Sequence, residues 1–156
     1  MIRCMRMSES NVGDARALLQ GFLRDDTHYR ASSGAYGDGG GEALERAVAL
    51  FLARPQIGFV WLAYSGDAAV GACVVCRAIS TSRGSIVAKL DDVTVHRDWQ
   101  GKGVGGAMLA QLRDHLRDEG MTRIDCGCHR DNQGAWRFYE RIGFVALDEE
   151  RLALLL

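Results

Sequence analysis

Residues 91–106 constrain this chain more than any other stretch, because they join an alternating apolar segment to a glycine-rich loop and the start of a helix. The alternation ends at Val95, and the run 107–109 begins the helix. Glycine permits positive φ and lets a ligand approach the backbone closely. The free N–H groups of a first helical turn, together with the helix dipole, attract an anion. This order of elements therefore predicts a phosphate site, with Lys102 as an added cation.

Two familiar phosphate loops fit this stretch poorly. A Walker loop needs Ser or Thr after Gly-Lys, whereas Gly103 follows Gly101-Lys102 here. Residues 101–106 do have the glycine spacing of a dinucleotide fingerprint. However, the acidic ribose reader expected about twenty residues later would fall near Asp125, inside a Cys-rich predicted strand. A tight connection without any ligand is the remaining alternative for a glycine loop considered alone.

A third pattern combines two motifs. They are Gln100-x-x-Gly103-x-Gly105 after a Val-x-Val strand, and Asn132-x-x-Ala135-x-x-x-Tyr139-x-x-x-Gly143-Phe144. In order and spacing they resemble the two cofactor elements of the GNAT superfamily of N-acetyltransferases, and they cover about the C-terminal third of the chain. The resemblance implies an α+β fold of three layers: a mixed, mostly antiparallel sheet with helices on both faces. It also implies acetyl-CoA as cofactor and an amine as acceptor.

Apolar periodicity predicts the element order β-α-α-β-β-β-α-β-α-β-β, which agrees with this resemblance. The stretch 25–41 between the first two helices is polar and glycine-rich, and we expect a mobile loop there. No domain boundary is evident, so one GNAT-like domain is expected over residues 1–156. The expected helices are 11–24, 42–53, 103–119 and 132–142, and the expected strands are 2–7, 57–64, 69–79, 86–95, 122–128, 144–147 and 151–156.

The resemblance places the cofactor along the strand end and the glycine loop. In the family, two neighbouring strands splay apart after this strand, and the pantetheine arm fills the gap. Main-chain groups of residues 93–95 are then expected to bond the arm, with an N–H near Val93 stabilising the oxyanion. Asn132 is either a first-turn helix residue or a side-chain contact to the arm. The implied cofactor set is Val93, Thr94, Val95, Gln100, Gly101, Lys102, Gly103, Val104, Gly105, Gly106, Asn132 and Ala135.

Three side chains are candidates for the chemistry. Tyr139 is the expected general acid, because a phenol with a pKa of about 10 stays protonated at neutral pH and can donate to a leaving thiolate. By helical spacing alone, it would be a packed aromatic. Asp91 and Asp92 are expected to attract a protonated amine or accept its proton, directly or through water. Adjacent strand residues point to opposite faces, so only one of them faces the acetyl group unless a bulge intervenes. A structural role is the alternative for both, and for Asp92 the favoured one.

The acceptor is less constrained. His28, Tyr29 and Tyr36 lie in the expected loop, where the family usually builds its acceptor pocket; solvated loop residues are the alternative. The acidic pair favours a small cationic amine such as a polyamine or an aminoglycoside. The alternative functions are acetylation of a protein or peptide amine, a non-catalytic acetyl-CoA sensor and a nucleotide-binding domain.

Composition limits the other partners. The net charge of −1 favours neither nucleic acid nor an anionic membrane, and no apolar run is long enough for a membrane span. The N-terminus lacks the features of a signal peptide, so a cytoplasmic protein is expected. Five scattered cysteines predict free thiols and no metal site. The apolar tail 152–156 fits a homodimer interface and an interior strand equally well.

Overall fold

The computed structural model describes residues 1–156 and is built on one five-stranded sheet with the order β1-β2-β3-β4-β5. The strands are β1 (Ile2–Arg6), β2 (Gly58–Ser65), β3 (Ala68–Ser80), β4 (Ser85–Val95) and β5 (Ile124–Cys126). The first four pair in antiparallel fashion, and β5 pairs parallel to β4. The expected mixed, mostly antiparallel sheet is confirmed.

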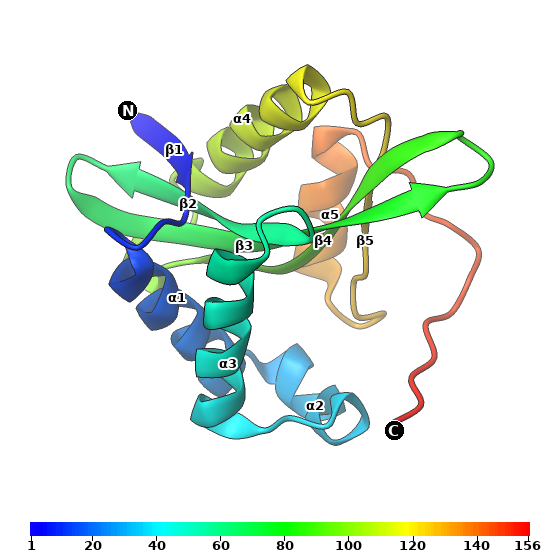
Figure 1. Ribbon diagram of the computed structural model, residues 1–156, viewed down its shortest axis with the longest axis horizontal. Coiled ribbons are helices and arrows are strands. Elements are labelled where there is room, and N and C mark those ends of the chain that lie inside the picture. The colour runs from blue at the N-terminus through cyan, green and yellow to red at the C-terminus, as the bar shows by residue number, and fades with distance from the viewer.

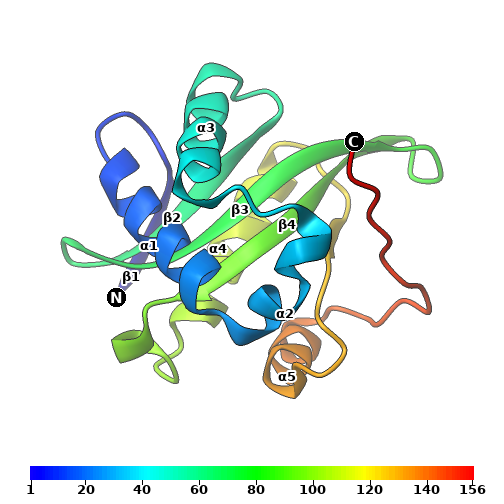
Figure 2. The same cartoon turned by 90° about the horizontal axis from the view of Figure 1, so that it is seen from below.

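Helices cover both faces of this sheet (Figure 1). They are α1 (Val12–Asp25), α2 (Thr27–Tyr36) and α3 (Gly40–Ala53) on one face, and α4 (Val104–Asp118) and α5 (Gln133–Ile142) on the other. Figure 2 looks from the first side and shows α1, α2 and α3 in front of the strands. None of the helices combines the length and the apolar character needed to cross a bilayer.

Each face of the sheet has its own buried core. Met108, Leu112 and Leu116 recur every fourth residue along α4, and all three are fully buried against the sheet. Leu19 of α1 and Val48 of α3 are buried against the opposite face. Burying an aliphatic side chain of this size stabilises a fold by about 1.5–3 kcal/mol. The apolar stripes of the helices therefore fix them to the sheet that carries the site.

The stretch 25–41 is not the mobile loop that its composition predicts, because ten of its residues form α2. The side chain of Asp26 caps the helix by accepting from the N–H of Tyr29 at 2.8 Å. Gly37 ends it with a left-handed φ of 70°. No residue of α2 is buried. The helix is therefore set by its caps, and it has no apolar repeat by which periodicity could reveal it.

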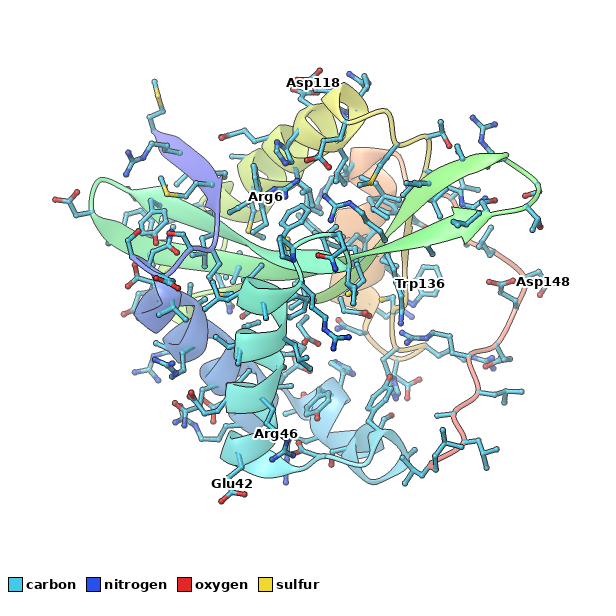
Figure 3. The ribbon with its side chains drawn as sticks, viewed as in Figure 1. Arg6, Glu42, Arg46, Asp118, Trp136 and Asp148 are labelled. Carbon is cyan, nitrogen blue, oxygen red and sulfur yellow. The ribbon has the colours of Figure 1, made fainter.

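The two strands expected at residues 144–147 and 151–156 are also wrong. After α5 the chain continues to its end without helix or strand, and Figure 3 shows Asp148 on this segment, out to the side of the sheet. Its apolar side chains are not buried; Val145 and Leu152 are 82% and 96% exposed. A short apolar run forms a strand only where it pairs with a neighbouring strand, and here the edge of β5 stays unpaired.

Candidate active site

A β-bulge interrupts β4 at the two candidate aspartates. Val74 of β3 lies opposite Asp91, but Ala72 lies opposite Thr94, so β4 carries one extra residue between these pairs. Asp92 takes up the irregularity with a φ of 51°, the one left-handed backbone among the non-glycine residues. Asp tolerates this region better than most residues, and such strain concentrates at functional sites.

The bulge places both carboxylates on one face of the sheet. Leu90 and Val93 pack on the α4 side although strict alternation would separate them, so the pattern shifts between these two residues. Asp91 pairs across the sheet with Val74, which belongs to the core under α1 and α3. Asp92 lines a pocket together with the same Val74. Adjacent strand residues share a face only where a bulge intervenes, and β4 has such a bulge at these two residues.

The two aspartates have different electrostatic surroundings. Burial, and next the neighbouring Asp91, raise the pKa of Asp92 to about 6. The carboxylate of Asp91 lies 3.5 Å from Nζ of Lys89 and 3.8 Å from Nη1 of Arg151. Asp92 therefore ionises just below neutral pH, the range suited to a group that accepts a proton, while Asp91 is held between two cations.

β4 and β5 separate immediately before the bulge. Their last paired residues are Leu90 and Cys126, and residues 91–95 have no partner on the β5 side. On the other side, the N–H of His96 donates to a carbonyl oxygen of β3 at 2.8 Å.

Alternation along β4 decides which backbone groups face this open edge. Thr94 turns the same way as His96, so its backbone groups face β3 and are not available to a ligand. Those of Val93 and Val95 point to the open edge. Of the three residues expected to bond an extended ligand, only these two therefore offer their N–H groups to it.

The glycine loop presents successive unpaired N–H groups. Among the turn, cap and side-chain hydrogen bonds, none has a donor N–H from residues 101–106, and the first bond at the start of α4 runs from the N–H of Ala107 to the carbonyl oxygen of Gly103 at 3.0 Å. Gly101 and Gly103 have φ of 72° and 80°, and a Cβ at Gly101, Gly103 or Gly106 would meet no heavy atom within 4 Å. The loop is thus open, and its groups suit a pyrophosphate.

Other loop residues hold the surrounding structure in place. A Cβ at Gly105 would lie 3.1 Å from two ring atoms of Phe138, so glycine lets α4 approach α5. The side chain of Gln100 donates from Nε2 to a carbonyl of β4 at 3.1 Å. The side chain of Val104 is buried in the core, so only its N–H is free for a ligand. Nζ of Lys102 lies 5.3 Å from the centroid of the neighbouring indole ring and forms no ion pair.

Tyr139 comes from α5 toward the end of β5. Its ring packs against Phe138 and Phe144, with centroids 5.2 and 5.3 Å apart. Burial raises the pKa of its phenol, and the nearby thiols Cys126 and Cys128 raise it further. Its hydroxyl makes no hydrogen bond within the chain. It therefore stays protonated at neutral pH and is free to donate to a ligand where the strands separate.

Asn132 caps α5. Its Oδ1 accepts from the N–H of Ala135 at 3.1 Å, while Nδ2 donates to no group of the chain. Trp136, labelled in Figure 3, donates from its indole Nε1 to the carbonyl oxygen of His129 at 3.2 Å and so ties the turn to the helix. The cap leaves the amide N–H groups of Asn132 for a ligand.

All three substrate candidates lie on α2. Tyr29 lines the same pocket as Asp92, and Tyr36 stacks on Tyr29 with centroids 5.8 Å apart. The ring of His28 lies 5.4 Å from that of His129, in the segment after β5. The structure thus brings Tyr29 to the aspartates, whereas His28 contacts the segment that leads into α5.

The pocket itself was not predicted. It has a volume of about 300 Å³ and lies between the sheet, α1 and α3. Asp38 also lines it and accepts from the hydroxyl of Tyr29 at 2.8 Å. Its glycine-rich surroundings in the sequence did not mark Asp38 as a site residue, and the apolar stripes of α1 and α3 indicated only packing.

Unpaired N–H groups in the glycine loop, an open strand edge and a protonated phenol together form a site suited to an extended, phosphate-bearing ligand. Residues 25–144 match the sequence profile of the acetyltransferase (GNAT) family. The chain belongs to this family, which uses acetyl-CoA. The resemblance found in the sequence is confirmed.

Two relatives match parts of the chain. It is 41% identical over 68 residues to the mycothiol acetyltransferase of Nocardiopsis dassonvillei, covering 43% of this chain and 20% of that protein. It is 40% identical over 53 residues to the L-amino acid N-acyltransferase MnaT of Escherichia coli, covering 34% and 31%. The chain thus spans less than a third of either relative's length.

A solved structure shares the fold. It is AAC(6')-Iy in complex with the bisubstrate analog CoA-S-monomethyl-acetylneamine, with a TM-score of 0.80 over 100% of this chain and 99% of that one. The identity is 12%, so the likeness concerns the fold alone.

Proposed function

We propose that this chain transfers the acetyl group of acetyl-CoA to a primary amine of a small molecule, by direct attack in a ternary complex, and that residues 1–156 act as one domain. The observation that carries the proposal is a continuous line of free backbone groups from the glycine loop to the two candidate catalytic side chains. The free N–H groups of residues 101–106 lead along the open edge of β4 to the bulge at Asp92, and the phenol of Tyr139 is influenced by Cys126 and Asp91, which lie where β4 and β5 separate. Acetyl-CoA supplies the thioester, and the chain supplies binding and proton transfer.

In this proposal, backbone groups do the binding. The N–H groups of residues 101–106 hold the diphosphate at the positive end of α4, and Lys102 adds a charge. Val93 and Val95 bond the pantetheine arm as a strand would. The N–H of Val93 donates to the carbonyl oxygen as negative charge develops there. Removing one such donor from an enzyme typically costs about 100- to 1,000-fold in rate.

Side chains move the protons. Asp92, ionised above a pKa of about 6, attracts the ammonium and accepts a proton from it, directly or through water. The neutral amine then forms the new C–N bond while the C–S bond breaks. Tyr139 donates its proton to the leaving sulfur, and the second proton, released by the new amide nitrogen, returns to the phenol, so that the thiol and the amide leave as neutral groups. Asp91 lies between Lys89 and Arg151, and its negative charge helps to raise the pKa of Asp92.

Turnover separates this function from the alternatives. Incubation with acetyl-CoA and a panel of amines should release free thiol only when an amine is present. Tight coenzyme A binding without turnover on any small or peptide amine would identify a sensor. Thermal protection by NAD or ATP but not by coenzyme A would identify a nucleotide-binding domain.

The glycine loop can be tested by binding alone. Gly103→Ala should weaken coenzyme A about tenfold in calorimetry, because a side chain in the left-handed region costs about 1–2 kcal/mol and the loop must shift to relieve it. Gly120→Ala is the matched control, since Gly120 has a φ of 84° at the other end of α4, with no atom within 4 Å of its Cβ position. It should lower stability similarly and leave coenzyme A affinity unchanged; equal losses of affinity would contradict the assignment.

A second copy of the chain is the partner we propose for the tail. The tail has no strand partner, its leucines are exposed, and β5 has a free edge. Light scattering should therefore give a dimer at micromolar concentration, and Leu154→Asp should shift it to a monomer. A parent chain that is already monomeric would rule out the homodimer. The exposed large side chains of this segment are Leu152, Leu154, Leu155 and Leu156.

A further inference from the structure

The pocket beside Asp92 is mostly apolar. Helix α1 contributes Leu19 and Leu23 to its wall, and β3 contributes Val74. The side chains contributed by α3 are Ala43, Leu44, Ala47, Val48 and Phe51. An occupant therefore exchanges water for aliphatic and aromatic contacts over most of its surface, which favours an apolar body at about 25 cal/mol per Å² buried.

The charges on this pocket have one sign. Asp92 and Asp38 line it, and no Lys, Arg or His does. The cations that pair with the neighbouring carboxylates do not line the pocket. Lys89 and Arg151 flank Asp91, and Nη1 of Arg30 lies 3.8 Å from Asp38. A ligand ammonium finds a partner here, whereas a ligand carboxylate would meet two like charges.

From these two features we infer that the acceptor is a primary amine on a compact apolar body without a carboxylate, as in an arylalkylamine; the inference rests on the proposed function. The ammonium pairs with Asp92 at the bulge, and the body lies against α1 and α3. Asp38 already accepts from the Tyr29 hydroxyl and the N–H of Gly40 and lies beside Arg30, so a second ammonium of a polyamine would find no free carboxylate and would be desolvated along an apolar wall. An aminoglycoside would leave hydroxyl groups without partners there. The apolar wall therefore favours a different acceptor from the polyamine or aminoglycoside that Asp91 and Asp92 alone suggested.

Matched acceptors test the inference. With saturating acetyl-CoA, kcat/KM for phenethylamine should exceed that for phenylalanine, which adds only the carboxylate, by about 10- to 100-fold, as expected for an unpaired polar group in a site. It should exceed that for spermidine, which lacks the apolar body, by a similar factor. Turnover of spermidine or phenylalanine equal to or above that of phenethylamine overturns this inference and leaves the acetyltransferase function intact. Failure of every amine to release thiol overturns both.

A pair of variants on α3 tests the location. Ala47→Phe fills part of the pocket with a ring and should raise KM for phenethylamine at least about tenfold, because the ring takes the space in which the ligand's body makes its apolar contacts. Ala49→Phe, on the exposed side of the same helix, should leave KM unchanged. Coenzyme A affinity, measured by calorimetry, should match the parent in both variants and shows that they are folded. An unchanged KM in Ala47→Phe would place the acceptor elsewhere.

Discussion

Tyr139→Phe should lower kcat about 100- to 10,000-fold, the range over which a positioned general acid contributes to a rate. The ring keeps its packing against Phe138 and Phe144, so coenzyme A affinity and thermal stability should stay close to those of the parent. Because the pKa of the phenol is raised by burial, the parent should show no loss of activity from this group on the alkaline side of neutral pH. Steady-state kinetics and calorimetry measure both effects.

The control for this prediction removes another tyrosine hydroxyl. Tyr64 donates to Asp14 at 2.8 Å on a different part of the sheet, so Tyr64→Phe should cost about 1 kcal/mol of stability and leave kcat unchanged. If Tyr139→Phe retains nearly full kcat, the phenol is only a packing group and another donor protonates the sulfur.

Asp92→Asn should raise stability while removing activity. Burial holds the pKa of Asp92 at about 6, above its ordinary 3.8, so the stability of its neutral form is fully present below pH 3.8 and is lost as pH rises through 6. Asn stays neutral and tolerates the left-handed φ of 51°. The variant should therefore be more stable than the parent by about 2–3 kcal/mol at pH 8, and the gain should shrink toward pH 4.

The kinetic consequence has the opposite sign. In the parent, kcat/KM should rise through pH 6 as Asp92 ionises, and in the variant this limb should disappear as the rate falls about 100-fold or more. Urea unfolding at several pH values and pH–rate profiles check the two effects. Asp67→Asn, in the exposed turn between β2 and β3, is the charge-matched control and should change neither. A variant that is less stable at pH 8 would show that ionised Asp92 is held by favourable contacts.

Local requirements made part of the site predictable. Gly101 and Gly103 adopt positive φ, which glycine reaches at least cost, and the loop they form leads directly into α4. The helix that carries Tyr139 was predictable because its start and end are set by its own caps, Asn132 and Gly143. Such features depend on neighbours a few residues away, so the sequence displays them.

The failures have a common origin in contacts that are distant along the chain. Helix α2 buries none of its residues, so its pattern is invisible to periodicity. The tail 144–156 has two short apolar runs of the kind that form strands but no strand partner within this chain. A pattern predicts what a segment is able to form, whereas pairing and packing decide what it does form.

By itself, the sequence determined the family, most of the element order and the glycine loop that leads into α4, since glycine conformations, caps and apolar repeats are local properties. Only the tertiary structure decided that Asp91 and Asp92 share a face, that an apolar pocket opens beside them, and that Thr94 turns away from the open edge. The reason is the register of β3 against β4. One extra residue in one strand reverses every side chain beyond it, and that register is set by two cores packing at once on opposite faces of the sheet.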